Sequence, residues 1–578
     1  MKMRVWLCLL IFTLTACQSA KPQADVVSEG NEQVKAEEEK TQKQQAEKEK
    51  ENTENKENQG LEQTNYEPIA NEEKTSMQTY QDNYRNFYEI FVASFYDSDG
   101  DGKGDLKGVE EKLPYITGMG FTGIWLMPIH PSGTYHKYDV ADYYAIDESY
   151  GSMEDMDSLI QASKEREVKL ILDLVLNHTA DDHPWFQEAV EYLKKLPKDA
   201  EPNLEECPYI DYYYFTRESG KGKAYHPIAG TDWYYEGVFW GEMPDLNVDN
   251  PKVREEFEKI IAFWLGKGVG GFRLDAVKEY HTGRTGKNVE FLSWLTQTCR
   301  KYNPEVYLVG EAWSDFHEIA EYYGSGMDSF FNFALAMHEG KIAQVVNQNN
   351  AKHTVASYAE AMTKIEETFS AKNPDYIDAL FVANHDNVRM ANYFKQDVDK
   401  MKLAAGLYLT MTGSSFTYYG EEIGMNSSGT KDENKRTAMV WDREIKIENP
   451  KDAEIFEQLA TPMTEQEKDE NSLLRYYQKA LKMRQRIPEI ARGKVTTYPQ
   501  YGDKDMAVIK KSWKDNAVYV VYNLSDQEKE IDFSAENWQN EELLDYLSND
   551  IADIPKWENQ RLSIPARCIV VLGKMRGE

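Results

Sequence analysis

Apolar and polar positions follow two rhythms between about residue 84 and residue 490. Short apolar runs, typical of strands buried on both faces, alternate with amphipathic stretches typical of surface helices, such as 152–167, 252–267 and 289–302. Eight such strands in series, joined by helices, predict an α/β fold with a (β/α)8 TIM barrel. The predicted strands are 87–93, 123–127, 169–175, 271–274, 306–309, 329–333, 379–382 and 416–419.

Two parts of the chain depart from this rhythm. The connection over 179–250, after the third strand, is dense in Trp, Tyr, Pro and Gly and is too long for a structureless loop, so it predicts an inserted domain B over the barrel mouth. The barrel itself is then expected to comprise 84–178 and 251–490. From 491 to 578 the pattern changes to short alternating strands, at 507–511, 517–523, 530–533 and 568–572, which predicts a C-terminal β-sandwich.

The chain begins with the features of a secretory signal. Lys2 and Arg4 precede an apolar run over 5–14 that is too short to span a bilayer. The run ends in LTAC, which resembles a bacterial lipobox, so residues 1–17 are predicted to be a signal peptide with a lipobox. The resemblance implies cleavage before Cys17 and lipidation of that cysteine. The alternative is an ordinary secretory signal that happens to contain Cys17.

Residues 18–80 are mostly Glu, Lys, Gln and Asn, with too few apolar residues to offset the entropy of ordering, so they predict a disordered, charged tether. Together with the lipobox they predict an extracytoplasmic protein, anchored by lipid to the cell membrane.

Composition narrows the class of protein. The net charge of −33 gives no basic stripe for phosphate and argues against nucleic acid. The 12 Trp, 37 Tyr and 22 Phe suit a carbohydrate enzyme, because aromatic faces stack on sugar rings as well as filling cores. Cys207, Cys299 and Cys568 lie far apart in the sequence and indicate no disulfide framework.

Three acidic residues end three different predicted strands: Asp275, Glu311 and Asp386. Arg273 lies two residues before Asp275, on the same side of a strand, and would hold that carboxylate ionised as a nucleophile. Glu311 lies between an apolar strand and Trp313, where desolvation would raise its pKa and suit it to general acid/base work. The alternative for Arg273 and Asp275 is a purely structural ion pair.

These residues lie in motifs that resemble the α-amylase family of glycoside hydrolases. The stretches 173–178, 271–278, 310–313 and 382–386 resemble its first four conserved regions, MPDLN at 243–247 resembles the fifth, and 120–128 resembles the strand-two motif. The resemblance implies a retaining mechanism with Asp275 as nucleophile, Glu311 as acid/base and Asp386 as the third carboxylate. It also implies substrate-binding residues, one stacking tyrosine, two histidines and several charged groups: Tyr138, His178, Arg273, Lys278, His385, Asp432 and Arg436.

The loop DSDGDGKGD at 97–105 spaces oxygens like the first part of an EF-hand, and Gly108 stands where the last glutamate would be. We predict bound Ca²⁺, since the loop also resembles family members that bind calcium after strand one; the alternative is a solvated acidic turn. The expected ligands are Asp97, Asp99, Asp101, the carbonyl of Lys103, and Asp105. A second calcium site is not predicted, because Glu279 follows Lys278 where many α-amylases have histidine.

Ala276 and Lys278 differ from the pattern of α-1,6-specific relatives, so the resemblance favours internal α-1,4 bonds of starch or maltodextrin. Three alternatives stay open: an oligo-1,6-glucosidase or neopullulanase-like enzyme, a maltodextrin transglycosylase, and a non-catalytic glucan-binding lipoprotein. The last needs the barrel and its aromatic residues but not all three carboxylates. We expect the enzyme to be a monomer.

Overall fold

The computed structural model describes residues 68–69, 80–218, 224–348, 351–444, 446–536, 538 and 540–574. The predicted signal peptide, Cys17 and most of the predicted tether lie outside these residues. No helix in the described part of the chain is long and apolar enough to cross a membrane.

The tether prediction is corrected at its end. Ile69 is fully buried, its N–H donates to Glu467 at 3.2 Å, and Gly118 leaves room for its carbonyl: a Cβ at Gly118 would lie 2.1 Å from that oxygen. Ile69 therefore belongs to the folded unit and not to the tether.

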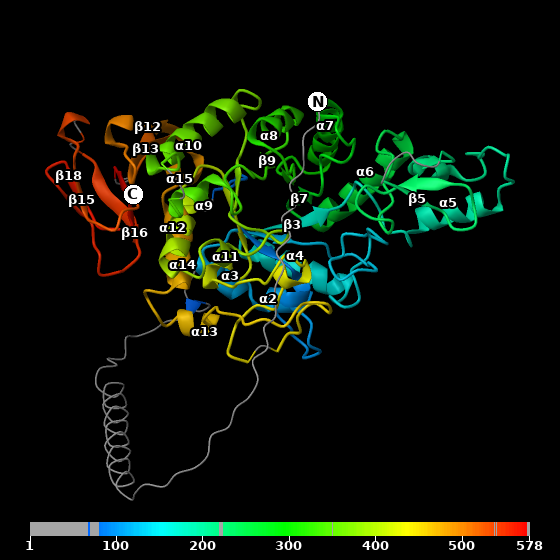
Figure 1. Cartoon of the computed structure of the whole chain (residues 1–578), viewed down its shortest axis with the longest axis horizontal. Helices are drawn as coiled ribbons and strands as arrows, with labels where there is room; N and C mark the ends of the chain where they lie inside the picture. Colours follow the sequence, from blue (N-terminus) through cyan, green and yellow to red (C-terminus); the bar gives the residue numbers. More distant parts are fainter. Residues whose placement is uncertain are drawn as a thin grey trace, which may run out of the picture. The chain divides into compact units, whose positions relative to one another are not determined.

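Eight parallel strands form one sheet in the order β10-β11-β1-β2-β3-β7-β8-β9. A parallel bridge between Phe331 and Ala379 joins the two ends, so the sheet forms a nearly closed barrel (Figure 1). All eight predicted strands are confirmed, although β9 and β10 are only two residues long. The strands are β1 (Asn86–Ile90), β2 (Gly123–Leu126), β3 (Lys169–Leu174), β7 (Gly271–Leu274), β8 (Tyr307–Gly310), β9 (Ser329–Phe330), β10 (Ala379–Leu380) and β11 (Ser414–Tyr418).

Amphipathic helices cover the barrel, and local sequence fixes their ends. Ser152 and Asp155 form a capping box at the start of α4, and Asn250 caps α6, which ends at Gly268 in the left-handed region (φ 105°). The helices are α2 (Leu106–Glu111), α3 (Leu113–Met119), α4 (Met153–Glu165), α5 (Pro184–Lys195), α6 (Pro251–Lys267), α7 (Thr285–Tyr302), α8 (Phe316–Tyr322), α9 (Lys341–Val346), α10 (Val355–Ser370), α11 (Met390–Tyr393), α12 (Val398–Leu409), α13 (Met463–Gln466), α14 (Leu473–Arg486) and α15 (Glu489–Arg492).

Register aligns the polar residues that end the strands. Asp173 of β3 pairs with Arg273 of β7, which pairs with Val309 of β8, and Glu311 directly follows β8. Gly271 permits the close approach of β7 and β8, because a Cβ there would lie 2.0 Å from the carbonyl oxygen of Tyr307. The register therefore brings three charged side chains to one end of the barrel.

The segment between β3 and α6 contains α5 and a small antiparallel sheet, β4 (Phe215–Thr216), β6 (Tyr234–Glu236) and β5 (Tyr225–Pro227), visible beside the label α5 in Figure 1. Isolated bridges join His178 to Asp245 and Tyr213 to Leu246. These bridges fix the end of the insert against the end of β3. The domain boundaries that we drew around it stay a prediction.

Antiparallel sheets follow the barrel, as predicted from the change of rhythm. One has the order β12-β13-β14-β19-β16 and the other β15-β18-β17, and a separate core containing Val521, Phe533 and Leu562 lies between them. The strands are β12 (Lys494–Thr497), β13 (Met506–Trp513), β14 (Asn516–Asn523), β15 (Lys529–Asp532), β16 (Glu542–Ser548), β17 (Lys556–Glu558), β18 (Arg561–Ile564) and β19 (Cys568–Gly573).

Candidate active site

A cleft of about 450 Å³ opens at the carboxyl ends of the barrel strands. Most of the predicted site residues line it, whereas Arg273 and His385 are fully buried beneath it and Lys278 lies beside it. The lining residues are His136, Tyr138, His178, Phe239, Trp240, Met243, Asp275, Ala276, Glu311, Trp313, Asp386, Asp432, Lys435 and Arg436.

Arg273 is shared by three carboxylates. Its Nη1 donates to Asp275 Oδ1 (2.6 Å) and to Asp173 Oδ1 (3.0 Å), and its Nη2 donates to Glu311 Oε2 (2.8 Å). From the sequence we predicted that this guanidinium pairs with Asp275 alone. Since one cation faces three buried acids, a proton on one of them relieves their mutual repulsion.

Glu311 is the acid best placed to hold that proton. Burial raises its pKa to about 8, Arg273 opposes the rise, and the charges of Asp275 and Asp386 add to it. Its Oε2 also accepts from the backbone N–H of Ala276 (3.1 Å), a residue held at φ 46°. Both bonds fall on Oε2, which leaves Oε1 to carry the proton towards the cleft.

Asp386 is held ionised from two sides. Arg436 Nη2 lies 3.0 Å from its Oδ1, and His385 Nε2 lies 3.1 Å from its Oδ2. Burial would raise the pKa of this carboxyl, but His385 and then Arg436 outweigh it, and the pKa lies well below the usual range. Arg436 also pairs with Asp432 at 2.8 Å, so the predicted pair beyond strand eight reaches the third carboxylate directly.

His385 depends on a residue that the sequence did not single out. Glu89, on β1, accepts from His385 Nδ1 at 2.5 Å, and the two side chains are 1% and 0% exposed. Burial would lower the pKa of His385, but Asp386 and Glu89 raise it to about 9. A glutamate between apolar neighbours in a strand that is buried along its length, Asn86–Ile90, is the signal that could have identified it.

Tyr138 connects this pair to the arginine cluster. Its hydroxyl lies 2.7 Å from His385 Nε2 and donates to Asp173 Oδ2 at 3.0 Å. Asp173 was noticed in the sequence as part of a motif but was not assigned to the site; burial raises its pKa to about 6. The chain Glu89–His385–Tyr138–Asp173 therefore lies directly beneath the cleft.

His178 and Lys278 complete the predicted set, and one further lysine supports the site. His178 Nε2 lies 3.2 Å from the carbonyl of Tyr138, and burial lowers its pKa. Lys278 donates to the carbonyl of Trp313 at 2.9 Å, so it acts on the wall of the cleft. Lys435, which the sequence analysis missed, donates to the carbonyl of Asp386 at 2.7 Å and fixes the turn that carries that carboxylate.

Large aromatic side chains are exposed on the cleft walls. Phe239 and Trp240 come from the insert and are 46% and 55% exposed, and Trp313 follows β8 and is 44% exposed. Trp313 stacks on Phe333 at 5.1 Å, which holds its ring in place. Exposed flat rings in a polar cleft provide surfaces on which sugar rings can stack.

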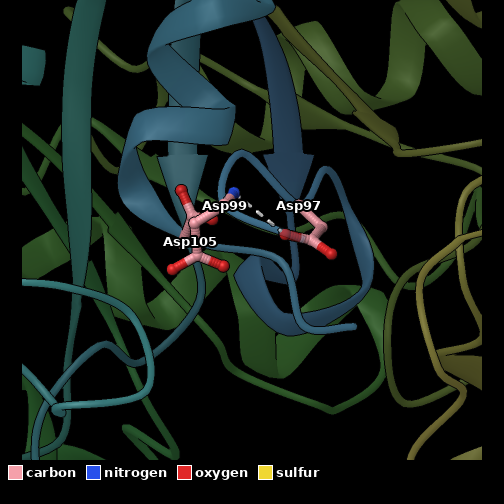
Figure 2. A group of neighbouring side chains, drawn as sticks. All are labelled: Asp97, Asp99 and Asp105. Atoms are coloured by element: carbon pink, nitrogen blue, oxygen red, sulfur yellow. Dashed lines mark hydrogen bonds between the residues drawn. The ribbon is translucent and has the colours of Figure 1, made fainter. Parts of the chain in front are cut away.

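The acidic loop brings together three of its four aspartates. Asp97, Asp99 and Asp105, drawn in Figure 2, have ligand oxygens within 4.8 Å of one another. Asp101 is not in the cluster, and its Oδ1 accepts from Lys103 N–H at 2.7 Å. Asp97 accepts from the N–H groups of Gly100 (2.6 Å) and Gly102 (2.8 Å), which fold the loop around it. The donor set is all oxygen, which suits a hard cation such as Ca²⁺.

Comparison with known proteins agrees with this geometry. The family model described as "Alpha amylase, catalytic domain" matches residues 89–493. The chain is 39% identical over 436 residues to "Alpha-amylase 3" of Dictyoglomus thermophilum, covering 75% of this chain and 83% of that protein. It is 32% identical over 343 residues to "Glucan 1,6-alpha-glucosidase" of Streptococcus pneumoniae, covering 56% and 62%. The solved structure of Eubacterium rectale Amy13B has a TM-score of 0.83 at 38% identity, covering 87% of this chain and 98% of that one.

Proposed function

The chain belongs to the α-amylase family of glycoside hydrolases, and from that premise we propose that it is a retaining enzyme that cleaves internal α-1,4 bonds of starch and maltodextrins. The observation that carries the proposal is the single guanidinium of Arg273, bonded to both Asp275 and Glu311. Retaining glycosidases need two carboxyl groups close together, about 5–5.5 Å apart, one ionised and one protonated. The shared guanidinium holds the two groups close, and burial raises the pKa of Glu311 to about 8, which makes Glu311 the protonated member of the pair.

In the proposed reaction Asp275 attacks the anomeric carbon. Its Oδ1 is held by Arg273, so Oδ2 forms the bond to carbon while the glycosidic C–O bond breaks. Glu311 gives its proton from Oε1 to the departing oxygen, and as a carboxylate it then takes a proton from water, which hydrolyses the glycosyl ester and restores Asp275. Asp386 and His178, which line the cleft, bind hydroxyl groups of the same sugar, and Tyr138 stacks under it. His385, beneath the cleft, holds Asp386 and Tyr138 in place.

Specificity for an internal bond of a long chain rests on the cleft walls. Exposed rings on both sides, Trp240 from the insert and Trp313 after β8, offer stacking surfaces beyond the sugar that is cleaved. A pocket closed on one side would instead restrict the enzyme to chain ends. The open, aromatic-walled cleft favours endo cleavage.

Product analysis tests the proposal. Chromatography of products from amylose and from a maltodextrin series should show maltooligosaccharides early, with rapid loss of iodine colour, and NMR of the first product should show the α-anomer. A β-anomer would exclude the retaining mechanism. Release of glucose alone from isomaltose, with maltotriose untouched, would exclude the α-1,4 assignment.

One relative supports a second candidate specificity. The similar protein from Streptococcus pneumoniae bears the name of an α-1,6-glucosidase, so cleavage of α-1,6 bonds is the first alternative to test. Transfer to a sugar acceptor instead of water is the second, because the same glycosyl ester serves both reactions. Isomaltose hydrolysis and longer products from maltotriose, respectively, distinguish them.

The enzyme is also proposed to hold one Ca²⁺ at Asp97, Asp99 and Asp105, which would contribute stability to the loop after β1. Finally, we propose that Cys17 is lipidated and anchors the enzyme outside the cytoplasm. Incorporation of labelled palmitate, absent in Cys17→Ala, tests the anchor, and release of an unlabelled secreted enzyme would contradict it.

A further inference from the structure

The amino-terminal end of the barrel holds a second cluster of buried cations, far along the strands from the cleft. Arg85 immediately precedes β1, Arg484 is in α14 and Arg492 ends α15, and the side chains of these arginines surround a small cavity. The cavity measures about 30 Å³ and is lined by Tyr80, Tyr84, Arg85, Asn86, Thr122, Arg484, Gln485, Ala491 and Arg492.

Among the described residues, the positive charge of this cluster is only partly compensated. Arg492 has a carboxylate, Asp82, which accepts from its Nε (2.7 Å) and Nη2 (2.8 Å). Arg484 is 2% exposed and donates only to neutral oxygens, those of Asn86 (3.0 Å), Leu409 (3.1 Å), Met411 and Gly413. Of the three arginines, only Arg492 forms an ion pair among the described residues. Burial lowers the pKa of Arg85, although the charges of Asp82 and Glu167 both act to raise it.

One donor in this cluster has no partner at all. Arg85 is 7% exposed; its Nη1 donates to the carbonyl of Tyr80 at 2.9 Å, but its buried Nε is unsatisfied. A buried N–H without a partner costs free energy, and a buried charge without a counter-charge costs more. Burial, and then the charge of Arg492, lower the pKa of Arg484 to about 9, as expected where positive charge is in excess.

We propose that this cavity binds one small monovalent inorganic anion of the size of chloride. A space of this volume accommodates one or two water-sized spheres, which is enough for a halide ion and too little for the four oxygens of sulfate or phosphate. The unsatisfied Nε of Arg85 donates to the ion. The hydroxyl of Thr122, whose Oγ1 accepts from Asn86 N–H at 3.0 Å, keeps its own hydrogen for a second bond.

The site is independent of the proposed reaction, since it lies at the opposite ends of the strands that carry Asp275 and Glu311. Its role is structural: the ion neutralises the contact of α14 and α15 with the strand that starts at Asn86. Water could fill the same volume, but it would leave the excess charge uncompensated. The two occupants therefore differ in how the protein responds to halide.

The decisive experiment is bromide soaking of crystals of the wild-type enzyme, followed by anomalous diffraction at the bromine edge. The expected result is an anomalous peak within hydrogen-bond distance of Arg85 Nε. Water in the cavity, or a carboxylate of the chain itself, with no bromide peak would overturn the proposal. This readout does not depend on catalytic activity or on any variant.

A solution experiment measures the same site. The melting temperature in sodium chloride, compared with sodium gluconate at equal ionic strength, should rise by roughly 1–2 °C for each tenfold increase in chloride above its dissociation constant. Arg85→Met should lose this rise, whereas Arg443→Met, at an exposed arginine paired with Glu465, should keep it. If Arg85→Met fails to fold, Arg85→Lys, which keeps the charge and loses Nε, replaces it. Equal melting temperatures in both salts would overturn the proposal.

Discussion

The two ends of the barrel bury charge in opposite ways. At the mouth, buried cations meet carboxylates: Arg273 bonds three of them and His385 lies between Glu89 and Asp386. At the amino-terminal end, the floor, Arg492 is paired with Asp82, but Arg484 and Lys511 donate to neutral oxygens. Paired charges shift one another's protonation and are costly to break singly, whereas cations held by carbonyls mainly fix the positions of backbone segments. The charges at the mouth are therefore arranged for proton transfer, whereas those at the floor hold neighbouring backbone segments together.

The largest effect on activity is expected from Asp275→Asn at the mouth of the barrel, because this substitution keeps the size of the side chain and removes the nucleophile. We expect kcat on maltodextrin to fall by roughly 10⁴-fold or more, as for loss of a nucleophile in other enzymes. Reducing-sugar release measures it. Asp249→Asn, at a 56%-exposed aspartate paired with His281, is the matched control and should stay near wild type. Retention of a tenth of the activity by Asp275→Asn would refute the assignment.

The next largest effect is expected from Glu311→Gln, with a loss of about 10²–10⁴-fold in kcat, because general acid catalysis is removed. Burial raises the pKa of Glu311 to about 8, so the wild-type acid is protonated at neutral pH and is lost as pH rises through 8. The wild-type rate should therefore fall on the alkaline side near pH 8, and this limb should be absent from the variant. Maltosyl fluoride, whose leaving group needs no proton, should restore the first step, seen as a burst of fluoride, while hydrolysis of the glycosyl ester stays slow because Glu311 is also its base.

Much of the active site could be predicted from the sequence, and the residues that could not be predicted were missed for physical reasons. Strand rhythm predicted all eight strands, and motif spacing predicted the carboxylates, because both depend on neighbours along the chain. Glu89 and Lys435 were missed because they reach the site only through register and loop folding. Ile69 was assigned to the tether because its burial depends on Gly118, a glycine distant in the sequence. Asp101 fits the spacing of calcium ligands, yet its carboxylate turns to its own loop.

Glu89→Gln tests whether the charge of Glu89 matters at the mouth. It removes the carboxylate that pairs with His385 and still allows a hydrogen bond to His385 Nδ1. Glu89 helps raise the pKa of His385 to about 9, so the variant histidine should lose its proton at a lower pH. We expect about a tenfold loss of kcat/KM at pH 8, with a smaller loss at pH 6, measured as a pH profile. Glu422→Gln, at a buried glutamate bonded by Tyr88 and Tyr115 away from the cleft, is the control whose profile should keep its shape. If the alkaline limb of the kcat/KM profile is not shifted in Glu89→Gln, Glu89 has only a packing role and does not set the protonation of His385.

A smaller effect is expected from removing calcium from the acidic loop. In the described part of the chain, the carboxylates of this loop form no ion pair with a cationic side chain, unlike the paired carboxylates at the mouth of the barrel. At a free Ca²⁺ concentration 100 times its dissociation constant, binding would stabilise the fold by about 2.7 kcal/mol. Calorimetry with and without chelator should show this as a lower melting temperature on chelation, restored by Ca²⁺. Asp97→Asn should abolish the response and Asp101→Asn should largely keep it. An identical melting temperature with and without chelator would show that the loop is a solvated acidic turn that binds no Ca²⁺.

The smallest effect is expected at the floor, from Lys511→Met. Lys511 is fully buried on β13, and its Nζ donates to Thr412 Oγ1 (3.0 Å) and to the carbonyl of Ile490 (2.9 Å). Burial, and then Arg484, lower its pKa well below 10.5. Between that lowered pKa and 10.5 the unfolded chain binds more protons than the folded one, so this group makes stability rise with pH.

Methionine removes that dependence and the cost of burying an ammonium, at the loss of two hydrogen bonds to neutral oxygens. Replacing buried charge by an apolar side chain of similar volume is often neutral or stabilising, so we expect the variant to lie within about 1 kcal/mol of wild type or above it at pH 7. Its advantage should be smaller at pH 10 than at pH 7, because part of the unfolded wild-type lysine has already lost its proton at pH 10. Urea unfolding at both pH values measures this, with Lys510→Met, at the half-buried neighbour on the other face of β13, as control. A loss of several kcal/mol at pH 7 would mean that the ammonium's bonds to Thr412 and Ile490 outweigh its desolvation, and that the floor depends on its cations as strictly as the mouth does.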